Sequence, residues 1–154
     1  MKRGAWALLL GALAMSLAGD VFLMFPGYFI PGLVSFLAAH VLYIALFRQG
    51  VDWFQSRRAL AVTLGVGAAM YAFLWAGGLP AALRVPVAAY VVVIALMAAQ
   101  AIGRATVQRD AASRAVAVGA CCFMLSDTLL ATNKFAAALP LSNLWILATY
   151  WAAQ

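Results

Sequence analysis

The chain has 154 residues, of which 68% are hydrophobic and only 9% are charged, and its formal net charge is +6. Soluble domains carry roughly 25% charged residues, so this composition, with a mean hydropathy of +1.01, excludes an ordinary soluble fold and indicates an integral membrane protein. The ten Lys and Arg residues are scattered among short polar stretches, which excludes an ordered basic face for binding nucleic acid.

Six apolar stretches follow one another along the chain, separated by short polar breaks or breaks with proline and glycine. A transmembrane helix needs about 20 apolar residues to cross roughly 30 Å of hydrocarbon, so a chain of this length holds at most about six. The sequence therefore predicts an all-α fold, a polytopic transmembrane helix bundle that forms a single domain over residues 1–154. We expect the spans near 5–25, 29–47, 59–76, 85–102, 115–132 and 140–154.

The first stretch has a second interpretation. MKRGAWALLLGALAMSLA has the basic start, the apolar segment and the small-residue ending of a signal peptide. Cleavage after it would leave five spans and place Asp20 almost at a chain end. Because apolar sequence continues through GDVFLMF, we favour a first transmembrane span.

Positive charge is concentrated on one side of the predicted bundle, and cytoplasmic loops are the ones that retain Lys and Arg. This pattern predicts an integral protein of the bacterial inner (plasma) membrane with both termini in the cytoplasm. Eight of the ten cations precede the first span or lie in the connections that follow the second and fourth spans: Lys2, Arg3, Arg48, Arg57, Arg58, Arg104, Arg109 and Arg114.

Two of the four acidic residues lie within apolar sequence. Asp20 stands in SLAGDVFLMF and Asp127 in MLSDTLL, whereas Asp52 and Asp110 lie in basic loops, where solvated charges are ordinary. A charged side chain at bilayer depth costs at least about 2.5 kcal/mol and marks a functional site. At 1.5 Å per residue from the cytoplasmic ends, the two intramembrane carboxylates lie roughly 21 Å and 18 Å deep. They are therefore placed to face each other.

Other polar residues form stripes on the predicted helices, because residues three, four or seven apart share a helical face. They predict a polar interior, slightly toward the outer side of the membrane. Either they satisfy one another as interhelical hydrogen bonds, with an aspartate paired to a lysine or histidine, or they build a functional site. The candidates are His40 and Tyr43 in the second span, Ser126, Asn133 and Lys134 in the fifth, and Tyr150 and Gln154 in the last.

Two adjacent cysteines, Cys121 and Cys122, are badly placed to bridge each other, and we expect both to be small core residues. Neither they nor any cluster of histidines suggests a metal site. Lys134 lies near a helix end, where its ammonium group can also reach the lipid headgroups.

Four motifs, in this order and at these separations, resemble the YhhN family of lysoplasmalogenase-like membrane proteins: GDVFLMF, IPGLVSFLAAHVLYIALF, SDTLLATNKF and YWAAQ. Residues 50–113 match this family only as hydrophobic spans. The resemblance implies a bundle of about eight helices that cleaves the vinyl-ether bond of lysoplasmalogens, releasing a fatty aldehyde and glycerophospho-ethanolamine or glycerophospho-choline. Family members have two further spans before the GD helix, and their last helix continues beyond AQ, so the chain resembles a short form.

The resemblance also implies site residues. Asp20 and Asp127 occupy the paired acidic positions of the family, and the seven polar candidates named above lie on its motif positions. Vinyl-ether hydrolysis needs an acid that protonates the alkene and a nearby anion, which two carboxylates supply. Asn133 and Lys134 are expected to hold the phosphate of a lysophospholipid, with no cofactor and no metal. A small transporter or lipid carrier and an inactive short family member remain the alternatives, and the oligomeric state is open.

Overall fold

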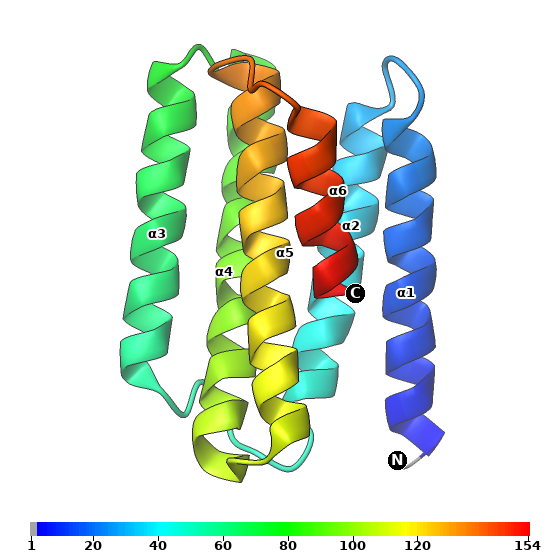
Figure 1. Cartoon of the computed structure of the whole chain (residues 1–154), viewed down its shortest axis with the longest axis vertical. Helices are drawn as coiled ribbons and strands as arrows, with labels where there is room; N and C mark the ends of the chain where they lie inside the picture. Colours follow the sequence, from blue (N-terminus) through cyan, green and yellow to red (C-terminus); the bar gives the residue numbers. More distant parts are fainter. Residues whose placement is uncertain (1–2) are drawn as a thin grey trace.

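The computed structural model describes residues 3–154, and these residues fold into helices joined by short connections (Figure 1). The predicted all-α bundle is confirmed, and most helix ends lie within a few residues of the predicted spans. The largest difference is in the fourth helix, which has 28 residues and continues well past the predicted end. The helices are α1 (Arg3–Leu23), α2 (Phe29–Phe47), α3 (Arg57–Ala76), α4 (Ala81–Gln108), α5 (Ala111–Phe135) and α6 (Ser142–Ala153).

Five of these helices, α1 to α5, are long and apolar enough to cross a membrane. The sixth predicted span is shorter in the structure, because α6 begins at Ser142 and has 12 residues. At 1.5 Å per residue it is about 18 Å long. Its last residues therefore lie at middle height in Figure 1 rather than at either end of the bundle.

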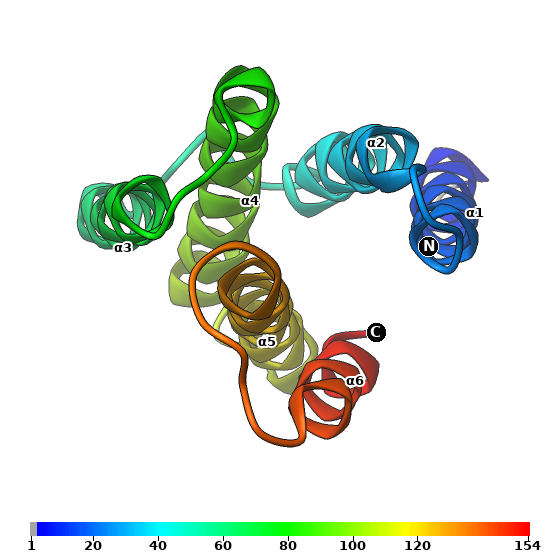
Figure 2. The same cartoon turned by 90° about the horizontal axis from the view of Figure 1, so that it is seen from above.

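The helices are arranged around α4, which packs against α2, α3 and α5. Seen from above, α1 lies on the outer side of α2, and α6 lies along α5 on the same side of the bundle (Figure 2). Side chains of α6 can therefore reach α1 and α2 across the space beside α5. The hydrogen-bonded cluster around Asp20, described below, makes this connection.

Glycine allows α1 and α2 to approach closely. A Cβ atom at Gly19 would lie 2.6 Å from the ring of Phe36, and one at Gly32 would lie 2.8 Å from the side chain of Leu23. Each glycine thus leaves room for a large side chain of the other helix. Small residues at such contacts are how helices associate in lipid, where the hydrophobic effect between them is absent.

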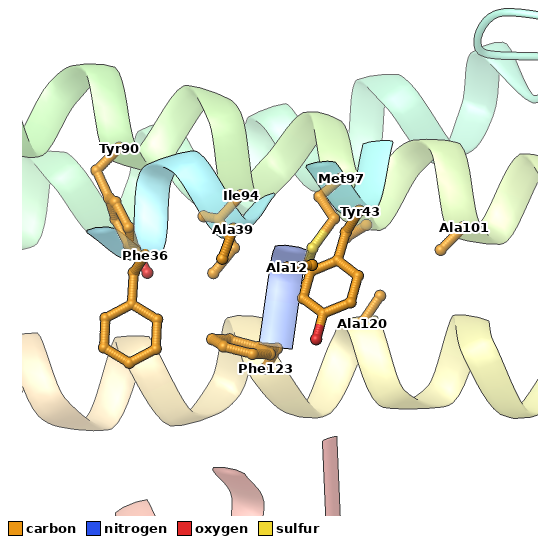
Figure 3. Close-up of a cluster of buried hydrophobic side chains, with 11 residues drawn as sticks. Ala12, Phe36, Ala39, Tyr43, Tyr90, Ile94, Met97, Ala101, Ala120 and Phe123 are labelled. Carbon is orange, nitrogen blue, oxygen red and sulfur yellow. The ribbon is translucent and has the colours of Figure 1, made fainter. Parts of the chain in front are cut away.

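The main core joins four helices, as the close-up in Figure 3 shows for most of its side chains. Tyr43 and Phe36 come from α2, Tyr90 from α4 and Phe123 from α5, and alanines fill the spaces between them. The buried members are Ala12, Phe36, Ala39, Tyr43, Tyr90, Ile94, Met97, Ala98, Ala101, Ala120 and Phe123. The side chains of two tyrosines, Tyr43 and Tyr90, thus belong to this otherwise apolar core.

The start of α1 and the α2–α3 and α4–α5 connections share the lower end of Figure 1, and the other three connections share the upper end. Of the eight cations assigned to one side, Lys2 lies outside the described residues, and the other seven belong to elements at or near the lower end. Arg84 and Lys134 belong to helix ends at the opposite side. This grouping agrees with the predicted alternation, while the cytoplasmic location of the lower end stays a prediction.

Candidate functional site

The first polar cluster is built around Asp20, which is half-buried on α1. Its Oδ2 atom accepts a hydrogen bond of 2.7 Å from the hydroxyl of Tyr150 on α6. Gln154 donates from Nε2 to the same hydroxyl at 3.1 Å, and the Tyr43 hydroxyl of α2 donates to Gln154 Oε1 at 2.9 Å. The structure thus brings four predicted residues from three helices into one hydrogen-bonded chain that ends on a carboxylate.

The second carboxylate, Asp127, is half-buried on α5 and accepts a hydrogen bond at Oδ2 from the hydroxyl of Tyr90 on α4. Tyr90 is 7% exposed, and it was not among the predicted residues. Its only signal in the sequence is a hydroxyl in the otherwise apolar run VPVAAYVVV. Each intramembrane aspartate is therefore held by a tyrosine of a different helix.

His40 lies between the two clusters, and none of its surface is exposed. Its ring centroid is 4.7 Å from that of Phe123 and 5.3 Å from that of Tyr90, in edge-to-face contacts. Within residues 3–154, neither ring nitrogen has a hydrogen-bond partner. The alternative in which His40 pairs with an aspartate is therefore not what the structure contains.

Phe123 connects the surroundings of the two aspartates. Its ring centroid lies 5.5 Å from that of Tyr150, the tyrosine that donates to Asp20. Phe123 also contacts His40, and His40 in turn packs on Tyr90, the tyrosine that donates to Asp127. Phe36 closes the layer, with centroids 6.0 Å from Phe123 and 6.2 Å from Tyr150. The two polar clusters are thus separated by one layer of aromatic rings.

The remaining predicted residues lie on the upper half of α5 and hold the chain itself. Ser126 donates to the carbonyl oxygen of Ile146 at 3.0 Å, which ties α6 to α5. Asn133 accepts at Oδ1 from the backbone N–H of Leu139 at 3.0 Å, which closes the α5–α6 connection. Lys134 is exposed rather than paired with an aspartate. Its Nζ atom lies 4.8 Å from the centroid of the Phe29 ring.

A largely apolar pocket, here called the upper pocket, lies among α2, α3, α4 and α5. Its cavity volume is about 70 Å³, so the pocket is narrow in this structure. Asp127 and Tyr90 line it together with many aliphatic and aromatic side chains. Phe29 and Phe135 also line it, and Lys134 lies over their rings.

A second pocket, the lower pocket, opens among α1, α2, α4, α5 and the end of α6, with a cavity volume of about 440 Å³. It is mainly apolar, but Tyr43, Gln154 and Arg104 contribute polar groups to its lining. Arg104 donates to the carbonyl oxygens of Phe47 at 3.2 Å and Gln49 at 2.7 Å. The lower pocket therefore reaches the Asp20 cluster from the end of the bundle that carries most of the cations.

Comparison with known proteins agrees with these motifs, since the model of the YhhN family matches residues 1–154. This chain belongs to the YhhN family. Lysoplasmalogenase TMEM86B of Homo sapiens is 37% identical over 151 residues, which is 98% of this chain and 62% of the relative. Lysoplasmalogenase TMEM86A of Bos taurus is 33% identical over 147 residues, which is 92% of this chain and 60% of the relative.

The YhhN-family chain thus spans about three fifths of the length of these curated relatives. No solved structure matches it. The expected family membership is confirmed, as is the prediction of an integral membrane protein with several transmembrane helices.

Proposed function

We propose that this YhhN-family protein is a membrane-embedded hydrolase that cleaves the vinyl-ether bond of lysoplasmalogens. The products are a fatty aldehyde and glycerophospho-ethanolamine or glycerophospho-choline. The observation that carries the proposal is the carboxyl group of Asp127 in the lining of an apolar pocket among the transmembrane helices. The relatives named lysoplasmalogenase support the same substrate class.

The chemistry begins with proton transfer from a carboxyl group to the alkene carbon distal to the ether oxygen. This transfer turns the ether carbon into an oxocarbenium ion, which an ionised carboxylate stabilises. Water adds to the cation, and the resulting hemiacetal releases the aldehyde and the glycerol hydroxyl. Asp127 lines the upper pocket, so we assign it the proton transfer to the alkene. Asp20, in the hydrogen-bonded chain behind the aromatic layer, acts as the anion that accepts a proton from water.

Lys134 is placed to bind the phosphate of the substrate. It is seven residues from Asp127 on the same helix, a separation of about 10 Å along the axis. About seven covalent bonds separate the reacting alkene carbon from the phosphorus atom, a reach of about 9 Å. The ammonium group lies over two aromatic rings that line the upper pocket, so a phosphate there leaves the alkene near Asp127. Asn133 keeps its amide N–H groups as further donors, because only its oxygen is bonded to Leu139.

The direct test is aldehyde release from a vinyl-ether lysophospholipid by the purified protein in detergent, beside Asp20→Asn and Asp127→Asn. The same lipid with a saturated ether is the negative control. The proposal expects release by the parent protein and loss in both variants, provided that all three unfold at similar temperatures. If a well-folded parent releases no aldehyde, the proposed activity is wrong, and lipid movement between two compartments of proteoliposomes becomes the next assay.

A further inference from the structure

Two buried side chains have polar atoms that the fold leaves without partners in residues 3–154. They are the ring nitrogens of His40 and the hydroxyl oxygen of Ser16, whose exposed fractions are 0% and 2%. Buried polar atoms in proteins are nearly always hydrogen-bonded, and where no protein group serves, an internal water does so. These atoms therefore mark two buried positions, one on α2 and one on α1, where an internal water would find a hydrogen-bond partner.

The two side chains lie at similar heights in the bundle. The antiparallel helices α1 and α2 touch at two places: a Cβ atom at Gly11 would meet Leu42, and one at Gly19 would meet Phe36. Halfway between these two contacts, residue 15 of α1 lies at the same height as residue 39 of α2. Ser16 and His40 each lie one residue beyond this match, in opposite directions along the bundle, so their heights differ by about 3 Å. Ser16 is also four residues before Asp20 and thus shares a face of α1 with it.

His40 contacts one lining residue of each pocket. Its ring packs on Tyr90, which lines the upper pocket and holds Asp127, and on Phe123, which lines the lower pocket. A water at His40 would lie between the surroundings of the two aspartates. The lower pocket also has polar groups of Tyr43 and Gln154 in its lining, so water can approach from that side.

We propose that His40 and Ser16 hold the water that the hydrolysis consumes, and that this water arrives through the lower pocket, on the opposite side of the aromatic layer from the lipid. The role of this water in the reaction rests on the proposed function, whereas its presence at His40 does not. In the reaction the water oxygen forms a bond to the oxocarbenium carbon. One of its protons passes to the Asp20 carboxylate, and the hemiacetal then collapses.

The presence of water can be tested without activity, because His40 is the one histidine of the chain. Protein labelled with ¹⁵N-histidine and purified through a tag without histidine gives ring-nitrogen NMR signals from this residue alone. The proposal expects magnetisation transfer from water to a ring N–H in detergent micelles. A ring without contact to water would overturn it, whether or not the protein cleaves lipid.

The role of the water is tested by competition with methanol. Capture of the oxocarbenium ion by methanol gives a stable mixed acetal, whereas capture by water gives the aldehyde. His40→Leu removes the groups that hold water and is expected to raise the ratio of mixed acetal to aldehyde about fivefold, the effect of one hydrogen bond. His40→Gln keeps polar groups and is expected to restore most of the parental ratio.

Thr63→Val is the matched control, because Thr63 is buried on α3 and its hydroxyl is bonded to the carbonyl of Leu60 in its own helix. Its product ratio should equal that of the parent. An unchanged ratio in His40→Leu, at any turnover rate, would mean that His40 does not select the nucleophile. That result would sink the proposed role even if the NMR experiment detects water.

The route of entry is tested by narrowing the lower pocket. Val116 lines this pocket on α5, whereas Val118 on the same helix is 63% exposed and faces away. We expect Val116→Phe to slow water exchange at His40 several-fold and Val118→Phe to leave it unchanged. Equal exchange rates in both variants would contradict entry through the lower pocket. A parent without lipid cleavage but with the expected exchange would refute the proposed function and not the water site.

Discussion

Tyr90 offers the sharpest test of the proposed chemistry. Its hydroxyl donates to Asp127 Oδ2, and it lies in the core with only 7% of its surface exposed. As Asp127 gives its proton to the alkene, negative charge develops on this carboxyl group, and the hydrogen bond from the tyrosine strengthens. An interaction that is stronger in the transition state than in the ground state acts on kcat rather than on KM.

Tyr90→Phe removes this donor and leaves the ring in place. A hydrogen bond to a charged group contributes about 1.5 to 3 kcal/mol. If all of that contribution belongs to the transition state, kcat falls by a factor of about 10 to 150 while KM stays near the parental value. Initial rates of aldehyde release over a range of substrate concentrations would measure both constants.

Tyr71→Phe is the matched control. It removes a tyrosine hydroxyl of the same bundle that donates at 3.0 Å to the backbone carbonyl of Arg84, and neither residue lines the upper pocket. Its kcat should match that of the parent. In the Asp127→Asn background, Tyr90→Phe should lower kcat little further, because both substitutions act on the same proton transfer to the alkene. Equal kcat values for the parent and Tyr90→Phe would refute the reasoning that Tyr90 supports proton transfer.

Three further predictions concern packing, substrate binding and pH. Gly19→Ala places a Cβ atom 2.6 Å from Phe36 and should lower the unfolding temperature in detergent. Gly65→Ala, whose Cβ atom meets nothing within 4 Å, should not lower it, and equal melting curves for the two variants would contradict this prediction. Lys134→Gln should raise KM about fivefold with little change in kcat, and Arg84→Gln, whose guanidinium lies over Trp75, should leave KM unchanged. Hydrogen bonds from Ser113 at the N-terminus of α5 lower the pKa of Asp110 from 3.8. The ionised carboxylate therefore stabilises the fold above that value, and this stabilisation is lost as the pH falls through the lower pKa of the folded state. Asp110→Asn keeps the cap without the titration, and its melting temperature should therefore fall less than that of the parent at acid pH.

Much of the fold was predictable, because hydrophobic length and proline, glycine or charged breaks determine where membrane helices start and end. Depth along each helix followed from the rise per residue. This is why Asp20, Tyr150 and Gln154, though far apart in sequence, were expected in one polar layer, and the structure brings them together. Whether that layer performs the proposed reaction stays a prediction.

The sequence was less informative about which neighbouring helix each polar side chain faces. Ser126 and Asn133 lie on the polar stripes of α5, yet their side chains hold α6 and the connection before it. Tyr90 was missed because a single hydroxyl in an apolar run has the same pattern as a lipid-facing aromatic residue. Only the packing of α4 against α5 turns it toward Asp127. Rotation about a helix axis depends on such contacts between helices, and periodicity alone does not supply them.

The fate of the proton provides the last test, because it separates alkene protonation from every route that leaves the alkene carbon untouched. In D₂O, the transferred deuteron comes from a carboxyl group that has exchanged with solvent, and it stays on the carbon next to the aldehyde. Mass spectrometry should find one deuterium at that carbon in each product molecule. Because Asp127 reaches the alkene from one wall of the upper pocket, the label should have a single configuration. Asp20→Asn should keep that configuration in its residual product, since Asp20 acts on water and not on the alkene. An unlabelled aldehyde would refute proton transfer to carbon, and a mixture of configurations would refute a single donor at Asp127.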